Sequence, residues 1–145
     1  MGPHRLTAAA RVGIPQVIVP GSIDHVQIHD SSIDTGERKR FPVNENSLYI
    51  RTSEEDNDYL GKEVAFKASA SKGKVQVVLP LGGYSKFDEE GKPGFDSLAN
   101  KTFVDSLLHW KSPHVPFVES NRHINDDLFS LIAVDQLLKL LVSRT

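Results

Sequence analysis

Residues 75–85, VQVVLPLGGYS, constrain the fold of this chain more than any other stretch. The first half is a short run of β-branched and apolar residues, which is typical of a strand covered on both faces, as in a parallel sheet. The second half breaks that pattern, because Pro80 ends strand pairing and Gly82 and Gly83 allow backbone angles that other residues avoid. The stretch predicts a central strand that runs into a polar turn ending at Ser85.

Two other segments follow the same order of strand and turn. Residues 16–19 form an apolar run before Pro-Gly-Ser, and residues 115–119 come before a polar turn at 121–126. Apolar spacing and capping residues predict helices before, between and after these strands. The expected helices cover residues 5–12, residues 52–70 with a capping box of Thr52 and Glu55, a segment capped by Asp96 with Ala99, Phe103, Leu107 and Trp110 inward, and residues 128–142. This order predicts an α/β fold with a small, mostly parallel sheet and right-handed crossovers.

Two segments depart from this regular order. Residues 24–30 alternate polar and apolar side chains, which favours a half-exposed strand on the edge of the sheet, and residues 47–51 indicate a brief strand. Residues 31–46 show no period and are expected to form a long loop, which is uncommon unless it covers a site or meets a partner. Residues 86–94 are charged and glycine-rich, and we expect a mobile excursion beside the central strand.

Length and composition exclude several classes of function. The 145 residues indicate one domain, residues 1–145, and the absence of cysteine excludes a disulfide framework, a thiolate zinc site and a cysteine nucleophile. The formal charge of -2 has no basic stripe, so we expect no nucleic-acid partner. No apolar run approaches the roughly 18 residues that span a bilayer, and we expect a cytoplasmic protein without a membrane partner.

The carboxyl ends of parallel strands open on the same edge of a sheet, where open α/β sheets bind ligands. Glycine amides and helix N-termini there favour a small anionic ligand, and Arg51 offers a guanidinium for phosphate or carboxylate. An alternative is that the same residues only form turns and caps. The residues expected at this edge are Gly21, Ser22 and Asp24 from the first turn, Gly82, Gly83 and Ser85 from the second, and His123, Asn125 and Asp126 from the third.

Known catalytic motifs are incomplete. The sequence contains neither of the two common nucleotide-binding motifs, G-x-x-x-x-G-K-[ST] and G-x-G-x-x-G. Gly82-Gly83 alone is therefore a weak signal for nucleotide binding. Ser85, His123 and either Asp24 or Asp126 could form a nucleophile, base and orienting acid, but the G-x-S-x-G elbow is absent. His25 and His29 are about 13 Å apart if their segment is extended, too far to share one metal ion.

The ordered set of turn motifs resembles a family of uncharacterised proteins similar to the tomato mosaic virus resistance protein, with a Tm-one-like ATP-binding domain. The matching pieces cover nearly the whole chain. They are GP.RL.AA...GIPQV at residues 2–17, G.ID at 21–24, N......RT at 44–52, EDN at 55–57, LPL.G.S at 79–85, FD at 95–96 and HIND at 123–126.

The resemblance implies a Rossmann-like three-layer sandwich that is the second half of a two-subdomain protein. Its implied ligand is ATP with magnesium, and its implied partner is a missing N-terminal half-domain or a second copy of the chain. The positions that carry over from the resemblance are Arg5, Gly21, Asp24, Asn44, Arg51, Thr52, Gly83, Ser85, His123, Asn125 and Asp126.

Three functions follow as hypotheses. The first is a nucleotide- or phosphate-binding half-domain with its ligand at the carboxyl ends of the strands. The second is a protein-interaction module, inhibitor-like or self-associating, without catalysis. The third is an enzyme that uses His123 as general acid or base, with Asp24 or Asp126 nearby.

Overall fold

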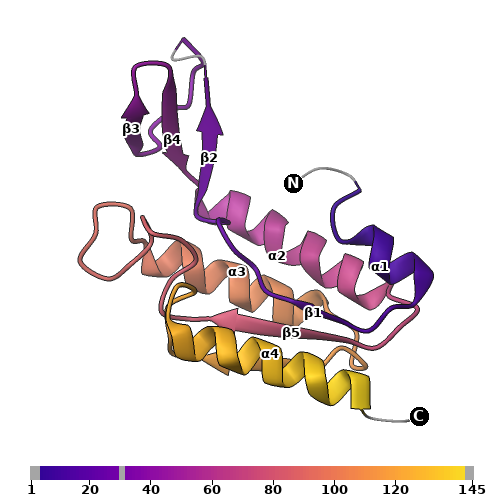
Figure 1. Ribbon diagram of the computed structural model, residues 1–145. Coiled ribbons are helices and arrows are strands. Elements are labelled where there is room, and N and C mark those ends of the chain that lie inside the picture. Colours follow the sequence, from indigo (N-terminus) through magenta and orange to yellow (C-terminus); the bar gives the residue numbers. More distant parts are fainter. Residues whose placement is uncertain (1–3, 30–31, 143–145) are drawn as a thin grey trace.

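The computed structural model describes residues 4–29 and 32–142 and contains four helices and six strands within them (Figure 1). In chain order, the elements are α1 (Thr7–Val12), β1 (Gln16–Ile18), β2 (His25–Ile28), β3 (Arg40–Asn44), β4 (Ser47–Arg51), α2 (Glu54–Ser69), β5 (Val75–Pro80), α3 (Ser97–Trp110), β6 (Phe117–Ser120) and α4 (Asp127–Val142).

The central sheet is parallel and has the strand order β1-β5-β6. All six residues of β5 are buried, as the apolar run predicts for a strand with a neighbour on each side and helices on both faces. In the strand register, Gln16 of β1 pairs with Val75 of β5, and Val77 of β5 pairs with Phe117 of β6. The predicted α/β class and parallel pairing are therefore confirmed.

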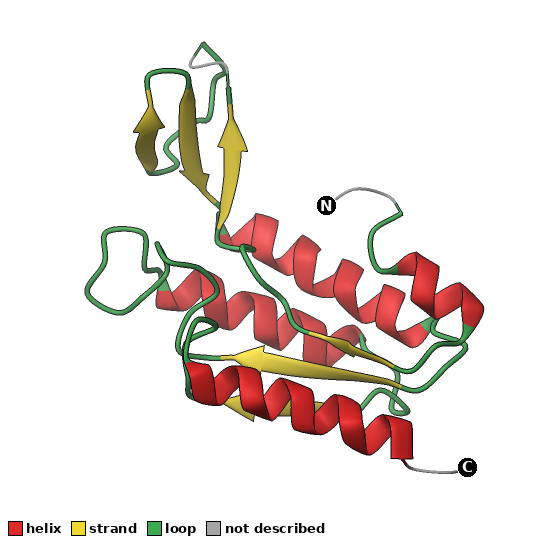
Figure 2. Ribbon diagram, in the orientation of Figure 1, coloured by secondary structure: helices red, strands yellow, loops and turns green. Residues whose placement is uncertain are grey.

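The helices form the two outer layers of a Rossmann-like sandwich (Figure 2). α2 and α3 lie together on one face of the sheet, α4 contacts β1 and β5 on the other, and α1 packs against α2. Gly61 lets α2 approach α3 closely, because a Cβ at this position would lie 2.5 Å from the Phe103 carbonyl oxygen. The core between these layers is formed by Ile18, Ile23, Val64, Ala68, Val75, Val77, Leu79, Tyr84, Phe103, Leu107 and Val115.

A second sheet corrects two predictions. β2, β4 and β3 form a separate antiparallel sheet that projects from the body (Figure 1), so residues 25–28 are not on the edge of the parallel sheet. Residues 40–44 are a strand rather than part of a loop. Four of these five residues are exposed and one is Pro42, so the segment lacks the alternation by which a half-buried strand is recognised. Asp30 and Ser31, which belonged to the two predictions, lie outside the described residues.

Two helix details also differ from expectation. Trp110 is 42 % exposed rather than inward, although Ala99, Phe103 and Leu107 of the same helix are fully buried. Trp110 is the last residue of α3 and packs against Phe66 at the surface, with ring centroids 5.8 Å apart. Over the described ranges, no helix combines the length and the apolar character needed to cross a lipid bilayer.

Candidate functional site

The turns that follow the three parallel strands lie side by side, as the parallel topology predicts. The Ser85 hydroxyl donates to the Asp24 carboxylate at 2.6 Å, which joins the second turn to the first. The Ser22 amide donates to the Tyr84 carbonyl at 2.8 Å, and His123 Nε2 lies 2.8 Å from the Ser85 carbonyl oxygen. One rim therefore gathers polar residues from three distant parts of the chain.

The amides of Gly82 and Gly83 in this rim bond within the protein. The Gly82 amide donates to the Arg122 carbonyl and the Gly83 amide to the Pro80 carbonyl, each at 3.1 Å. Gly83 has a φ of 135°, and a Cβ there would lie 1.8 Å from the Asp88 carbonyl oxygen. The two glycines let the turns pack tightly against each other.

The helices that begin on the rim carry their own carboxylates. Asp96 accepts a hydrogen bond from the Ala99 amide at 3.0 Å, as predicted for this cap, and Asp126 accepts one from the Leu128 amide at 2.8 Å. The hydrogen bond from Arg122, followed by the Leu128 amide, lowers the pKa of Asp126 below its ordinary value. The positive ends of α3 and α4 are therefore already complemented by negative charge.

The first turn of α2 also carries its own carboxylate. Its capping box begins one residue later than predicted. The capping box is formed by Ser53 and Asp56 rather than by Thr52 and Glu55. Both pairs have the required spacing, so the sequence does not distinguish them. Burial raises the pKa of Asp56, but hydrogen bonds from Ser53 and Arg38 outweigh it and hold this pKa below its ordinary value.

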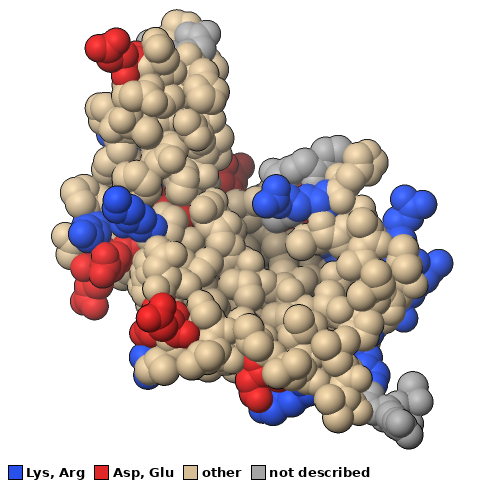
Figure 3. Space-filling view, in the orientation of Figure 1, with Lys and Arg blue, Asp and Glu red and all other residues tan. Residues whose placement is uncertain are grey.

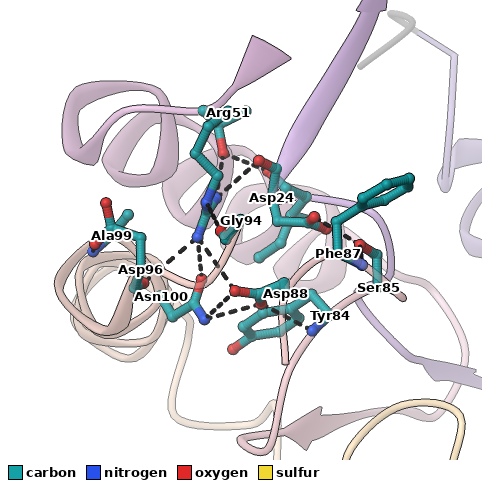
Figure 4. A network of polar contacts seen from close by, with 12 residues as sticks. Asp24, Arg51, Tyr84, Ser85, Phe87, Asp88, Gly94, Asp96, Ala99 and Asn100 are labelled. Carbon is teal, nitrogen blue, oxygen red and sulfur yellow. Dashed lines mark hydrogen bonds and ion pairs between the residues drawn. The ribbon is translucent and has the colours of Figure 1, made fainter. Parts of the chain in front are cut away.

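Arg51 is the centre of a buried polar cluster (Figure 4). It ends β4, is 4 % exposed, and directs its guanidinium into the protein. It donates to six acceptors, namely the carbonyls of Asp24, Gly94 and Asp96 and the side chains of Thr52, Asp88 and Asn100. Each guanidinium nitrogen thus has an acceptor within the protein.

Asp88 and Asn100 are members of this cluster that the sequence did not indicate. Asp88 is fully buried and accepts hydrogen bonds from the Tyr84 amide at 3.0 Å and the Asn100 amide group at 2.8 Å. It belongs to the charged loop 86–94, where an inward acid has no periodicity to reveal it. Burial, followed by the charges of Asp88 and Glu119, raises the pKa of Tyr84.

The three catalytic candidates do not form a triad in this structure. The Asn125 amide donates to His123 Nδ1 at 3.1 Å, so His123 Nε2 carries the ring proton and donates it to the Ser85 carbonyl oxygen. His123 therefore meets the backbone of Ser85 rather than its hydroxyl. The hydroxyl donates to Asp24, an acid, without an intervening base.

An open hollow lies at the carboxyl end of β1 and has a volume of about 300 Å³. It opens between the base of the projecting sheet and the N-terminal segment, where Figure 3 shows the surface hollowed. No described residue pairs with Arg5 of this hollow, in contrast to Arg51. The lining residues come from four segments and are Arg5, Gly21, Ser22, Ile23, His25, Val26, Thr52 and Leu60.

A second hollow, of about 250 Å³, lies beside α3 and includes Tyr84, Lys101 and Glu119 in its lining. Its cation, Lys101, forms an ion pair with Asp105 one helical turn away. The β1 hollow is thus better suited to an anionic ligand.

The structure defines an α/β domain with Rossmann-like layers and an open hollow where the first parallel strand ends. Residues 1–141 match the model of the uncharacterised protein family UPF0261, C-terminal domain, and the chain belongs to this family. A UPF0261 protein of Clostridium tetani is 31% identical over 144 residues, which cover 97% of this chain and 36% of the relative. A UPF0261 protein of Brucella melitensis is 30% identical over 132 residues, which cover 89% and 32%.

The family corrects the resemblance inferred from the turn motifs. The matching model and relatives are those of UPF0261, and they show no link to the tomato mosaic virus resistance protein. That resemblance was wrong, and the ATP site it implied loses this support. The chain spans about a third of the length of the relatives that it matches.

Proposed function

We propose that this domain supplies one wall of a binding site for a small ligand that carries a phosphate or carboxylate group. The site is the hollow at the carboxyl end of β1. One observation carries the proposal: the hollow joins turn, strand and helix residues from four segments around Arg5, an exposed arginine that no described residue neutralises. Nucleotides, including ATP with magnesium, are the ligand class that this location in an α/β sheet favours.

The topology supports this location. β1 is an edge strand of the parallel sheet, and α4 contacts it on one face. The chain that leaves β1 leads instead to α2, on the opposite face. The hollow lies at the carboxyl end of a parallel strand, the edge at which open α/β sheets bind ligands.

The polar atoms of the hollow support the same assignment. Ser22 is exposed and has a φ of 51°, a left-handed conformation that is uncommon for serine and frequent at functional turns. Arg5 supplies the positive charge and the donors that a phosphate or carboxylate needs. Arg51, Gly82 and Gly83 are left out of the proposed contacts, because their donors bond within the protein.

A hollow of about 300 Å³ is at the lower limit of ligand sites and is open on one side. We therefore assign the opposite wall to the two thirds of the longer protein that the relatives possess and this chain does not span. This domain then binds its ligand weakly by itself.

The test is a titration of this chain with ATP and magnesium, AMP and pyrophosphate, each up to about 10 mM, where even a millimolar site is mostly occupied. Amide NMR shifts at residues 21–26 should move first. Arg5→Gln should weaken binding about tenfold, in line with the loss of one charge-assisted contact. Arg11→Gln, an exposed arginine of α1 outside the hollow, is the matched control. Shifts at other residues, or none, contradict the proposal.

A second candidate function, self-association, is favoured by the outward face of α4. Phe129 is buried toward the sheet, whereas Leu131, Val134, Leu138 and Leu141 are 62, 53, 54 and 57 % exposed. Their spacing of three, four and three residues is the seam that pairs with a like helix in coiled coils. The occupant that this spacing favours is α4 of a second copy.

Sedimentation velocity tests this candidate directly. The parent chain should form a dimer as its concentration rises, and Leu131→Glu with Leu138→Glu should leave a monomer. Ser130→Glu, an exposed position of the same helix beside the seam, is the control that should still dimerise. A parent that stays monomeric excludes the second copy and assigns this face to the rest of the longer protein.

A further inference from the structure

We propose that His25 is the group of the β1 hollow that contacts the ligand through Nε2 and takes up a proton when an anionic ligand binds. This inference rests on the proposed function and adds an acid–base residue to it. His25 begins β2, lines the hollow together with Arg5 and Ser22, and retains 14% exposure of its side chain.

Asp24 fixes the state of the imidazole. It is fully buried, and its Oδ2 lies 2.9 Å from His25 Nδ1 and accepts the Ser85 hydroxyl at 2.6 Å. An ionised carboxylate can only accept, so Nδ1 must carry the proton that lies between the two side chains. The lone pair of neutral His25 is then on Nε2, and Nε2 is the only ring nitrogen left for a ligand.

Aromatic rings hold the imidazole in place. The ring centroids of Tyr49 and His25 are 4.3 Å apart, and the two ring planes are tilted by 33°. The Phe87 ring packs edge-on against the His25 ring, with the centroids 5.7 Å apart. Tyr49 and Phe87 contact each other at 4.7 Å. Two rings and one carboxylate thus orient His25 before any ligand arrives, the arrangement in which a histidine transfers protons efficiently.

The charged groups around His25 determine the sign of the proton linkage. Three charged groups surround His25, namely Asp24 at Nδ1, Arg51 opposite it in the strand register, and Arg5, which lines the same hollow. Arg51 is itself paired with Asp88, so an arriving phosphate or carboxylate adds the decisive negative charge and draws a proton onto Nε2.

The buried carboxylate supplies a second observation. Asp24 Oδ1 has no hydrogen-bond partner among the described residues, although it is inaccessible to solvent. A buried carboxylate with one unsatisfied oxygen is stabilised by a neighbouring positive charge. Protonation of His25 places such a charge beside it, so ligand binding and the stabilisation of Asp24 favour the same protonated state.

Two measurements test the inference. In the ligand-free chain, ¹⁵N NMR should show the Nδ1–H tautomer for neutral His25. Calorimetric titration with pyrophosphate, in two buffers of different ionisation enthalpy, should show uptake of up to about one proton per ligand near neutral pH. His25→Gln should abolish this uptake and weaken binding several-fold, while His29→Gln, just beyond the end of β2 and outside the hollow, should preserve both.

The outcomes separate this inference from the function on which it rests. Binding that depends on Arg5 but has the same proton uptake in His25→Gln overturns the role of His25 alone. An Nε2–H tautomer overturns it as well, because Nε2 would not be free to accept a proton. If none of the three phosphate probes binds, the proposed function and this inference fail together.

Discussion

Two arginines at the same end of the sheet have opposite surroundings. Arg51 is buried and donates to six acceptors, including the buried carboxylate of Asp88. Arg5 is exposed at the edge of the β1 hollow, and no described residue pairs with it. An arginine whose donors are all used stabilises the fold, whereas one with free donors can bind a ligand.

Arg51→Met removes the charge of the buried arginine and keeps a side chain of similar size. Asp88 would remain buried without its cationic partner, so we expect the free energy of unfolding to fall by about 3–5 kcal/mol. Urea unfolding followed by circular dichroism measures this change. Arg11→Met, at an exposed position of α1, should change the same quantity by less than about 0.5 kcal/mol. A loss below about 1 kcal/mol for Arg51→Met would mean that the cluster is not structural.

Gly83→Ala tests whether the rim next to the cluster is close-packed or open to a ligand. The new Cβ would lie 1.8 Å from the Asp88 carbonyl oxygen at a φ of 135°, and we expect a loss of about 2–4 kcal/mol. Gly91→Ala is a matched control, because its φ is 85° but nothing lies within 4 Å of its Cβ. That control should cost about 1 kcal/mol by strain alone. Equal losses in the two variants would show that the rim can move aside.

The fold followed from the sequence because it depends on patterns that extend over many residues. The apolar run of β5 and the helical spacing around Phe103 are repeated signals, and parallel pairing then places the three turns on one rim. The role of each polar residue on that rim depends instead on single contacts. Nothing in the charged loop distinguishes Asp88, which is buried, from Glu89 and Glu90 beside it, which are exposed.

The different roles of Arg51 and Arg5 likewise depend on single contacts rather than on a long pattern. The sequence placed Arg51 near a helix N-terminus and suggested a phosphate contact, but it could not show that six acceptors surround the guanidinium. β3 was missed for a related reason, since its pairing with β4 buries little and leaves no alternation. Long-range patterns determine which segments meet, while individual hydrogen bonds determine which side chains remain free.

Asp56 lies in the first turn of α2, a few residues after Thr52. Asp56→Asn tests the contribution of its carboxylate. The substitution weakens the capping box and the ion pair with Arg38, and near neutral pH we expect a loss of about 1 kcal/mol. The pKa of Asp56 is lowered in the folded protein, so its carboxylate stabilises the fold fully above its ordinary value of 3.8. The difference between parent and variant should shrink as pH falls below 3.8 through the lowered pKa. Asp105→Asn, at an exposed site of α3, should show no comparable loss near neutral pH. A gap that persists in strong acid would contradict the assigned role of the carboxylate.

Arg5→Gln should have the smallest effect on stability and the most specific effect on binding. Because Arg5 is exposed and its side chain has no hydrogen bond or ion pair with a described residue, the free energy of unfolding of the variant should stay within about 0.5 kcal/mol of the parent value. Thermal unfolding with and without pyrophosphate measures both properties in one experiment, since a bound ligand raises the midpoint. The midpoint of the parent should rise with pyrophosphate, and that of Arg5→Gln should rise much less, in line with about tenfold weaker binding. A destabilised Arg5→Gln would place Arg5 with Arg51 among the structural residues and remove the charge on which the proposed ligand site depends.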